Sequence, residues 1–253
     1  MTGPWKSVDG PAGALLMYAT TTLGSAPRSL AVLCHELPAY AAGVSGAGGI
    51  GVSFPVLADR LAEETGLRVV AGMLRGVGES VGDFSADGWL EDLSCLVDRE
   101  LGSEDRVWLV GYGLGGALAL RHAVTDSRVK GVAVLATPSD LSPWVVDPAA
   151  LLEHCRAVGV IRSPGFPTDV GQWTRALTLL QPLESVELLG DRSLLVVHGS
   201  EDTAMPVSEA RALAGRARTT GTVDLRIIPG AGHGLRTDPR SLATLIGWLE
   251  RRR

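Results

Sequence analysis

The sequence runs VWLVGYGLGGA over residues 107–117. Its first four residues are apolar and predict a short buried strand. The glycines that follow predict a tight turn, and a helix is expected over residues 117–124. Gly113 stands at the centre of that turn, where a residue without Cβ accepts a positive φ at little cost. The stretch therefore predicts a strand, a sharp turn and a helix in immediate succession.

The segments on both sides repeat this alternation of apolar runs and amphipathic stretches, which predicts an α/β fold with a mostly parallel sheet flanked by helices. Further strands are expected at residues 29–34, 68–73, 129–136, 194–198 and 223–228, and further helices at 54–65, 86–101 and 240–250. With 253 residues, the chain is expected to form a single domain spanning residues 1–253.

One region lacks this alternation. Residues 138–191 contain several prolines and no strong strand pattern. They predict an insertion of short helices between two strands, and insertions of this kind often cover a site as a lid.

Two later strands end in residues that suit acid–base chemistry. LLVVHGSEDT, residues 194–203, is a buried strand that runs into a turn carrying Asp202. IIPGAGH, residues 227–233, is a strand that runs into a glycine-rich turn ending in His233. We expect the Asp202 carboxylate to accept the Nδ1–H of His233, which fixes the tautomer and stabilises the imidazolium.

These motifs resemble the α/β-hydrolase superfamily. Residues 111–115 are similar to its nucleophile elbow, G-x-S-x-G, with Gly113 in the place of the serine, and the family's chain order of nucleophile, acid and histidine is kept. The chain is most similar to bacterial single-domain members of the serine-aminopeptidase or dienelactone-hydrolase kind. The resemblance implies Asp202 as acid, His233 as base and a degenerate nucleophile position at Gly113.

The same resemblance implies an oxyanion hole. The segment CHELP, residues 34–38, is similar to the family's loop that supplies one oxyanion N–H, here from Glu36 or Leu37, and the other comes from Leu114. Glu36 stands where the family usually has glycine, and its carboxylate is expected to point to solvent. No replacement nucleophile is expected: Tyr112 and Leu114 should point away from the site, and Cys34 is expected to be a buried, inert thiol.

A dinucleotide-binding fingerprint, G-x-G-x-x-G, is a remote alternative through Gly111, Gly113 and Gly116. Its context is poor, because the turn lies mid-chain and no acidic residue ends the next strand.

The net charge, the length of the apolar runs and the cysteine content limit the classes of partner that we expect for this chain. The formal net charge of −5 gives no basic field for nucleic acid, and no apolar run approaches the ~20 residues that span a bilayer. No secretory signal is recognisable, and three widely spaced cysteines favour a reducing, cytoplasmic setting. We expect a small-molecule substrate or ligand, with no cofactor and no metal; the oligomeric state stays open.

Three hypotheses about function remain. The Asp202–His233 dyad could act as a general base on an ester, lactone, thioester or amide without an acyl-enzyme. The chain could instead be a non-catalytic ligand-binding or regulatory member of the fold. Finally, Gly113 could be an engineered or allelic replacement in an ordinary serine esterase.

Overall fold

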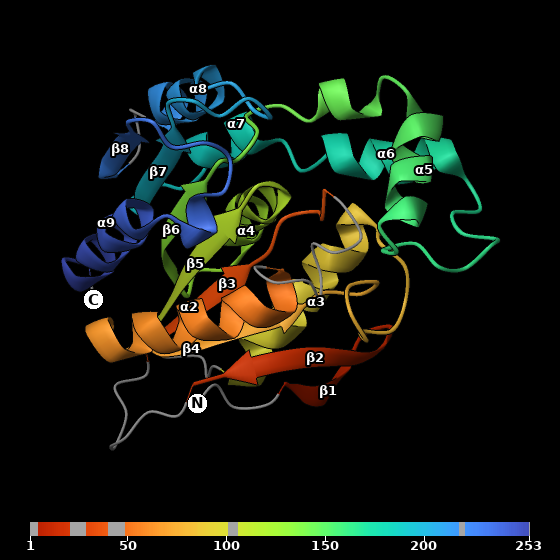
Figure 1. Cartoon of the computed structure of the whole chain (residues 1–253), viewed down its shortest axis with the longest axis horizontal. Helices are drawn as coiled ribbons and strands as arrows, with labels where there is room; N and C mark the ends of the chain where they lie inside the picture. The colour runs from red at the N-terminus through yellow and green to blue at the C-terminus, as the bar shows by residue number, and fades with distance from the viewer. Residues whose placement is uncertain (1–4, 21–28, 40–48, 101–105, 218–220, 253) are drawn as a thin grey trace.

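A mostly parallel sheet of eight strands forms the centre of the computed structural model (Figure 1). The structure describes residues 5–20, 29–39, 49–100, 106–217 and 221–252. Within these ranges the strands lie in the order β1-β2-β4-β3-β5-β6-β7-β8. Their bounds are β1 Lys6–Gly10, β2 Gly13–Ala19, β3 Ser29–Cys34, β4 Arg68–Met73, β5 Arg106–Tyr112, β6 Val129–Leu135, β7 Ser193–Gly199 and β8 Val223–Ile228.

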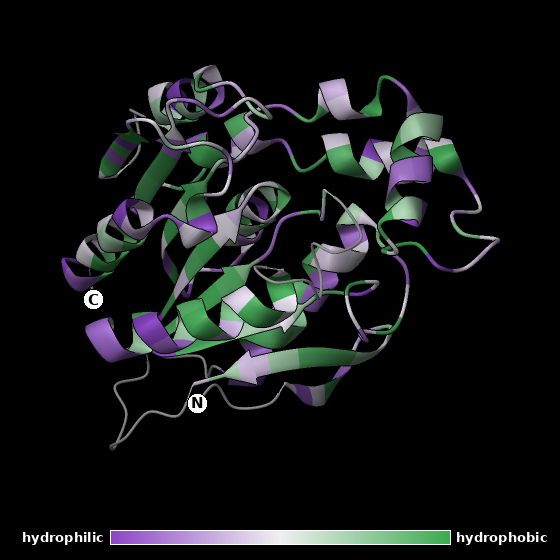
Figure 2. Cartoon of the chain, viewed as in Figure 1, coloured by the Kyte–Doolittle hydropathy of each residue, from purple (hydrophilic) through white to green (hydrophobic). Residues whose placement is uncertain are grey.

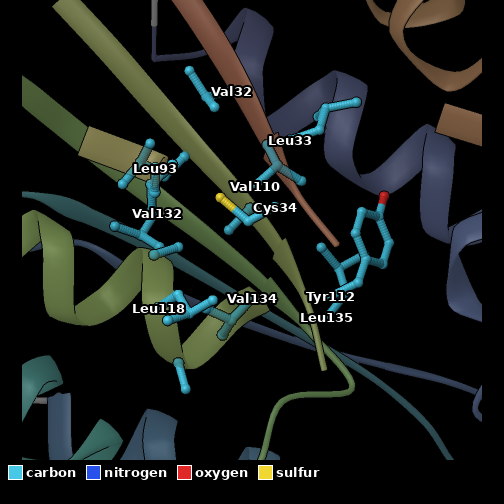
Figure 3. Packing of buried hydrophobic residues seen from close by; sticks show 14 of the residues in the cluster. Val32, Leu33, Cys34, Leu93, Val110, Tyr112, Leu118, Val132, Val134 and Leu135 are labelled. Carbon is cyan, nitrogen blue, oxygen red and sulfur yellow. The ribbon is translucent and has the colours of Figure 1, made fainter. Parts of the chain in front are cut away.

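The central strands are buried on both faces, which explains why they are apolar without alternation. The register places Val110 beside Leu33 of β3 and Ala133 of β6. Figure 3 shows Val32, Val110 and Val132 among the apolar side chains packed around these strands. Hydrophobic colour accordingly follows the strands in Figure 2, whereas hydrophilic colour appears mainly on the outer helices. Burial of these apolar runs sets the sheet order and brings the ends of β3, β5, β6, β7 and β8 to one edge.

Helices cover both faces of the sheet. α2 and α9 contact each other on one face, while α3 packs against α4 on the other, and α7 links α4 to α8 (Figure 1). The described helices are α2 Ile50–Thr65, α3 Ala86–Glu100, α4 Leu114–Thr125, α5 Pro148–Ala157, α6 Val170–Thr178, α7 Pro182–Glu187, α8 Ser208–Arg216 and α9 Pro239–Glu250, with 3-10 turns η1 Ser142–Val145 and η3 Leu235–Thr237. None of them is long and apolar enough to cross a membrane.

The predicted strands at 29–34, 68–73 and 223–228 have those bounds in the structure, and the other predicted elements differ by a few residues at their ends. The last residue of the helix expected at 86–101 lies outside the described residues. Two strands were not anticipated: β1 and β2 form an antiparallel hairpin, and β2 then pairs antiparallel with β4. β1 has one apolar side chain, Val8, so its sequence pattern is weak, whereas β2 buries Leu15, Met17 and Tyr18. Helix α8 was not predicted either.

The insertion predicted at 138–191 consists of η1, α5, α6 and α7, between β6 and β7. Its contacts with the rest of the molecule include two that approach the candidate site. The indole N–H of Trp173 donates to the Phe84 carbonyl at 2.9 Å, and the two rings meet edge to face. On α5, the Nε2 of His154 lies 3.1 Å from the carbonyl oxygen of Pro38, in the loop that follows β3. The insertion is therefore joined to a loop that contributes to the candidate site.

Candidate active site

The turn between β5 and α4 has the shape expected of an elbow. Gly113 adopts φ 52° and ψ −124°, and its N–H donates to the Leu135 carbonyl at 3.0 Å. Such a conformation is disfavoured for a residue with a Cβ. The helix begins at the very next residue, Leu114, and not at Ala117 as predicted. The tight turn is therefore built from a backbone that glycine adopts freely.

The glycines around Gly113 are explained by close packing of helix against strand. A Cβ at Gly115 would collide with the carbonyl oxygens of Cys34 and His35, and one at Gly116 would collide with the side chain of Thr137. This requirement accounts for the glycine pattern that also spells a dinucleotide fingerprint, so the pattern is no independent argument for a nucleotide.

Asp202 and His233, the residues predicted as acid and base, are in contact as expected. Nδ1 of His233 lies 2.8 Å from Oδ2 of Asp202, although 31 residues separate them in sequence. Oδ1 of the same carboxylate accepts the backbone N–H groups of Ala204 at 3.0 Å and Met205 at 2.9 Å. Asp202 is thus a buried acceptor whose second oxygen is left for the imidazole. With Nδ1 donating, Nε2 of His233 is the nitrogen able to take a proton, and 42% of this side chain is exposed.

A second histidine lies beside the acid. His198 is fully buried at the end of β7; its Nε2 is 3.0 Å from the Met205 carbonyl and 3.4 Å from Oδ2 of Asp202. Complete burial suits a packing role for this side chain. Its position also makes it a support of the turn that holds Asp202.

Glu36 does not point to solvent, contrary to the expectation from sequence. Its carboxylate forms an ion pair with the guanidinium of Arg236, on the turn that follows His233. The guanidinium carbon lies 5.2 Å from the centroid of the Phe54 ring, a cation–π contact. Arg236 was missed, because nothing near it in sequence connects it with a residue 200 positions earlier.

The loop that carries Glu36 is anchored by a buried histidine. The Nδ1 of His35 is 2.9 Å from the Glu36 carbonyl, and the backbone N–H of Leu74 donates to Nε2 at 3.1 Å. Burial lowers the pKa of His35 below its ordinary value, so this imidazole is held neutral.

The residues predicted to form the oxyanion hole lie on this loop and at the start of α4. Leu37 is half-buried and packs against the core. Leu114, as the first residue of α4, has a backbone N–H without a partner inside the helix. The oxyanion roles of Leu114, Leu37 and Glu36 stay predictions.

Part of this arrangement faces a cavity of about 270 Å³, whereas Asp202, Leu37 and Leu114 are not among its lining residues. Glu36, Gly113, His233 and Arg236 contribute to its wall. The remaining lining residues are Tyr112, Leu135, Ala136, Gly234, Leu235 and Thr237. Tyr112 was expected to point away from the site, yet it lines the cavity, because the strand ends there and its ring packs edge to face on Phe54. No described residue of the 138–191 insertion lines this cavity, so its role as a lid stays a prediction.

The cavity wall contains no serine or cysteine among the described residues. Burial raises the pKa of Cys34 to about 12, which keeps it protonated and poorly nucleophilic. The hydroxyl of Ser139 donates to the Glu209 carboxylate at 2.6 Å and is committed there. Within the described residues no group of three or more His, Cys, Asp or Glu side chains could hold a metal ion.

Comparison with known proteins places this geometry in a family. The model of the alpha/beta hydrolase family matches residues 31–245. Among solved structures, the chain is similar to an alpha-beta serine hydrolase homologue from Coxiella burnetii (21% identity, TM-score 0.62, 99% of this chain and 97% of that one). It is also similar to alpha/beta hydrolase domain-containing protein 10 from mouse (17%, TM-score 0.69, 98% of each). A third is Est1E from Butyrivibrio proteoclasticus (17%, TM-score 0.68, 98% and 97%). No curated protein matches the chain.

Proposed function

The chain belongs to the alpha/beta hydrolase family, and from that premise we propose that its cavity binds a small molecule on which the His233–Asp202 dyad acts as a general base. No acyl-enzyme forms in this proposal, since the elbow residue is Gly113. The observation that carries it is the 2.8 Å contact between His233 and a buried Asp202, with His233 and Gly113 lining one cavity. A dyad so aligned is suited to proton transfer.

The substrate class we propose is a small ester, lactone, thioester or amide. His233 would take a proton from a water molecule at Nε2, and the resulting hydroxide would attack the carbonyl carbon. The tetrahedral intermediate would then lose its alcohol, thiol or amine by cleavage of the C–O, C–S or C–N bond, and the imidazolium would give its proton to that leaving group. Asp202 would stabilise the imidazolium that forms. A positioned base of this kind contributes about 10²–10⁴ in rate. The N–H of Leu114, at the positive end of α4, is the proposed donor to the developing oxyanion.

A panel of short p-nitrophenyl esters, lactones and thioesters tests the proposal. Turnover by the unmodified chain should fall at least about a hundredfold in His233→Ala. Arg211→Ala, on an exposed position of α8, is the matched control and should turn over normally. Intact-mass spectrometry during turnover should show no added acyl group. A covalent adduct would overturn the mechanism without an acyl-enzyme, and turnover that survives His233→Ala would remove the dyad from the reaction.

A second candidate is a ligand-binding protein without catalysis, and the inward position of Glu36 favours it. A carboxylate near the position of a developing oxyanion opposes the negative charge that hydrolysis requires. The Arg236 guanidinium offsets that charge only in part. Ligand binding that is unchanged in His233→Ala, with no turnover of any panel member, would select this function.

A further inference from the structure

We propose that the Glu36 side chain, held by Arg236, occupies the room beside the elbow that a side chain at position 113 would need. Positions 36 and 113 are then coupled, and the Glu36–Arg236 pair is the polar group that a ligand meets at the elbow in place of a nucleophile. This coupling is independent of whether the dyad turns a substrate over.

The first support is steric. A Cβ built on Gly113 would lie 3.0 Å from Cβ of Glu36 and 3.8 Å from its Cα, and Glu36 is the only residue it would approach within 4 Å in the described structure. Carbon atoms in favourable contact are about 3.5–4.0 Å apart. The crowding at the elbow therefore comes from one side chain, and the removal of that side chain should relieve it.

The second support is that Glu36 is fixed at both ends. Its carbonyl is bonded to the buried His35 ring at 2.9 Å, which restrains the backbone. Its carboxylate is paired with Arg236, whose side chain is only 13% exposed and packs over Phe54. A side chain at position 113 could make room only if this ion pair shifted, and charges this far from solvent separate at a cost.

The coupling affects any attempt to restore a nucleophile at position 113. A serine placed at Gly113 would meet two obstacles: the positive φ, which disfavours any Cβ, and the contact with Glu36. Only the second depends on residue 36. A comparison of the same change with and without the Glu36 side chain therefore isolates the contact, because the backbone strain is common to both.

The test is a thermal-unfolding cycle of four proteins: the unmodified chain, Glu36→Gly, Gly113→Ser and the double variant. We expect Gly113→Ser to lower Tm by about 2–10 °C more in the presence of Glu36 than in the Glu36→Gly background. Glu36→Gln keeps the volume of the side chain but not its charge. In that background Gly113→Ser should lower Tm by as much as it does with Glu36 present. Equal losses with Glu36 present and in the Glu36→Gly background would overturn the proposal. If Gly113→Ser fails to fold in both backgrounds, the same cycle made with Gly113→Ala tests whether positions 36 and 113 are coupled.

A fluorophosphonate probe gives a second readout. The introduced serine oxygen bonds to phosphorus, fluoride leaves, and the hydroxyl proton passes to His233. Labelling of Glu36→Gly/Gly113→Ser should be at least tenfold faster than that of Gly113→Ser, and equal rates would count against the proposal. His233→Ala in the double variant should abolish the fast labelling. If the double variant folds yet none of these proteins is labelled, the dyad chemistry proposed above fails, while the unfolding cycle still decides the coupling.

Discussion

The carboxylate of Glu36 accepts a charged hydrogen bond from the guanidinium of Arg236, and this contact ties the loop after β3 to the turn that follows His233. Both side chains line the cavity, and both are mostly withdrawn from solvent, at 26% and 13% exposed. The pair therefore belongs to the framework of the site, and its loss should affect stability as well as binding.

A double-mutant cycle measures that contribution. Glu36→Gln, Arg236→Met and the combination should give a coupling free energy of about 1–3 kcal/mol in urea unfolding, because each single change leaves the other charge poorly paired. The exposed pair Arg60–Glu64 on α2 is the control and should give about 0.5 kcal/mol or less. Additive losses at Glu36 and Arg236 would show that the contact does not stabilise the fold.

Asp202→Asn should reverse the tautomer of His233. The backbone N–H groups of Ala204 and Met205 require an oxygen at the position of Oδ1, so the amide NH₂ of an asparagine would face His233. The imidazole would then carry its proton on Nε2 and could no longer accept one there. Nitrogen-15 NMR of the imidazole at pH 8 reads the tautomer directly.

Turnover, where found, should fall by up to about 10⁴ in the same variant. Asp140→Asn is the control, since that carboxylate only accepts the N–H of Ser142 in an exposed turn. An unchanged His233 spectrum in Asp202→Asn would contradict the hydrogen-bond pattern described above.

Gly115→Ala should destabilise the protein by at least about 2 kcal/mol. The added methyl group would collide with two backbone carbonyl oxygens at the end of β3, which cannot rotate away as a side chain could. Gly215→Ala is the matched control. It lies in the exposed last turn of α8 with nothing within 4 Å of its Cβ position, and should be neutral or gain up to about 1 kcal/mol. Similar unfolding midpoints for both variants would refute the packing account of the elbow.

Stability should fall as pH drops from 7 to 5. Burial lowers the pKa of His35, and burial likewise lowers that of His122, where Asp126 opposes the shift only in part. Below the ordinary histidine pKa of about 6.5 the unfolded chain takes up protons that the folded chain does not, so protonation favours unfolding. Each histidine contributes a slope of up to about 1.4 kcal/mol per pH unit.

Urea unfolding at pH 7, 6 and 5 measures this slope. His35→Gln can still offer a donor and an acceptor to Glu36 and Leu74, and it should flatten the profile, as should His122→Gln. Profiles as steep as that of the unmodified chain in both variants would exclude these histidines as the cause.

Much of this fold could be predicted because central strands of a parallel sheet are apolar throughout. Residues 29–34 show this, since five of the six residues of β3 are buried and apolar. The edge strand β8 was also predicted with its bounds, although it contains Asp224 and Arg226 and buries only Ile228. The meeting of Asp202 with His233 also followed, since both end neighbouring strands at one edge. β1 escaped prediction because this edge strand contains a single apolar side chain, Val8. β2, which lies between β1 and β4, was missed although Leu15, Met17 and Tyr18 are buried.

The direction of the Glu36 side chain could not be predicted, and the reason is physical. A glutamate on a loop is usually solvated, and only the position of a particular guanidinium makes the inward rotamer favourable. That guanidinium is on Arg236, which lies beside Glu36 because the sheet brings the loop after β3 and the turn after His233 together. The inward position of Tyr112 had the same origin, because it depends on where β5 ends and on Phe54 from α2.

The hydrogen bond from His154 to the Pro38 carbonyl connects the inserted helices with the loop that carries Glu36. Pro38 lies two residues beyond Glu36, so the loop and α5 share a joint. A ligand that displaces Glu36 would therefore strain the contact between His154 and Pro38, and a change at the cavity would reach α5 through one hydrogen bond.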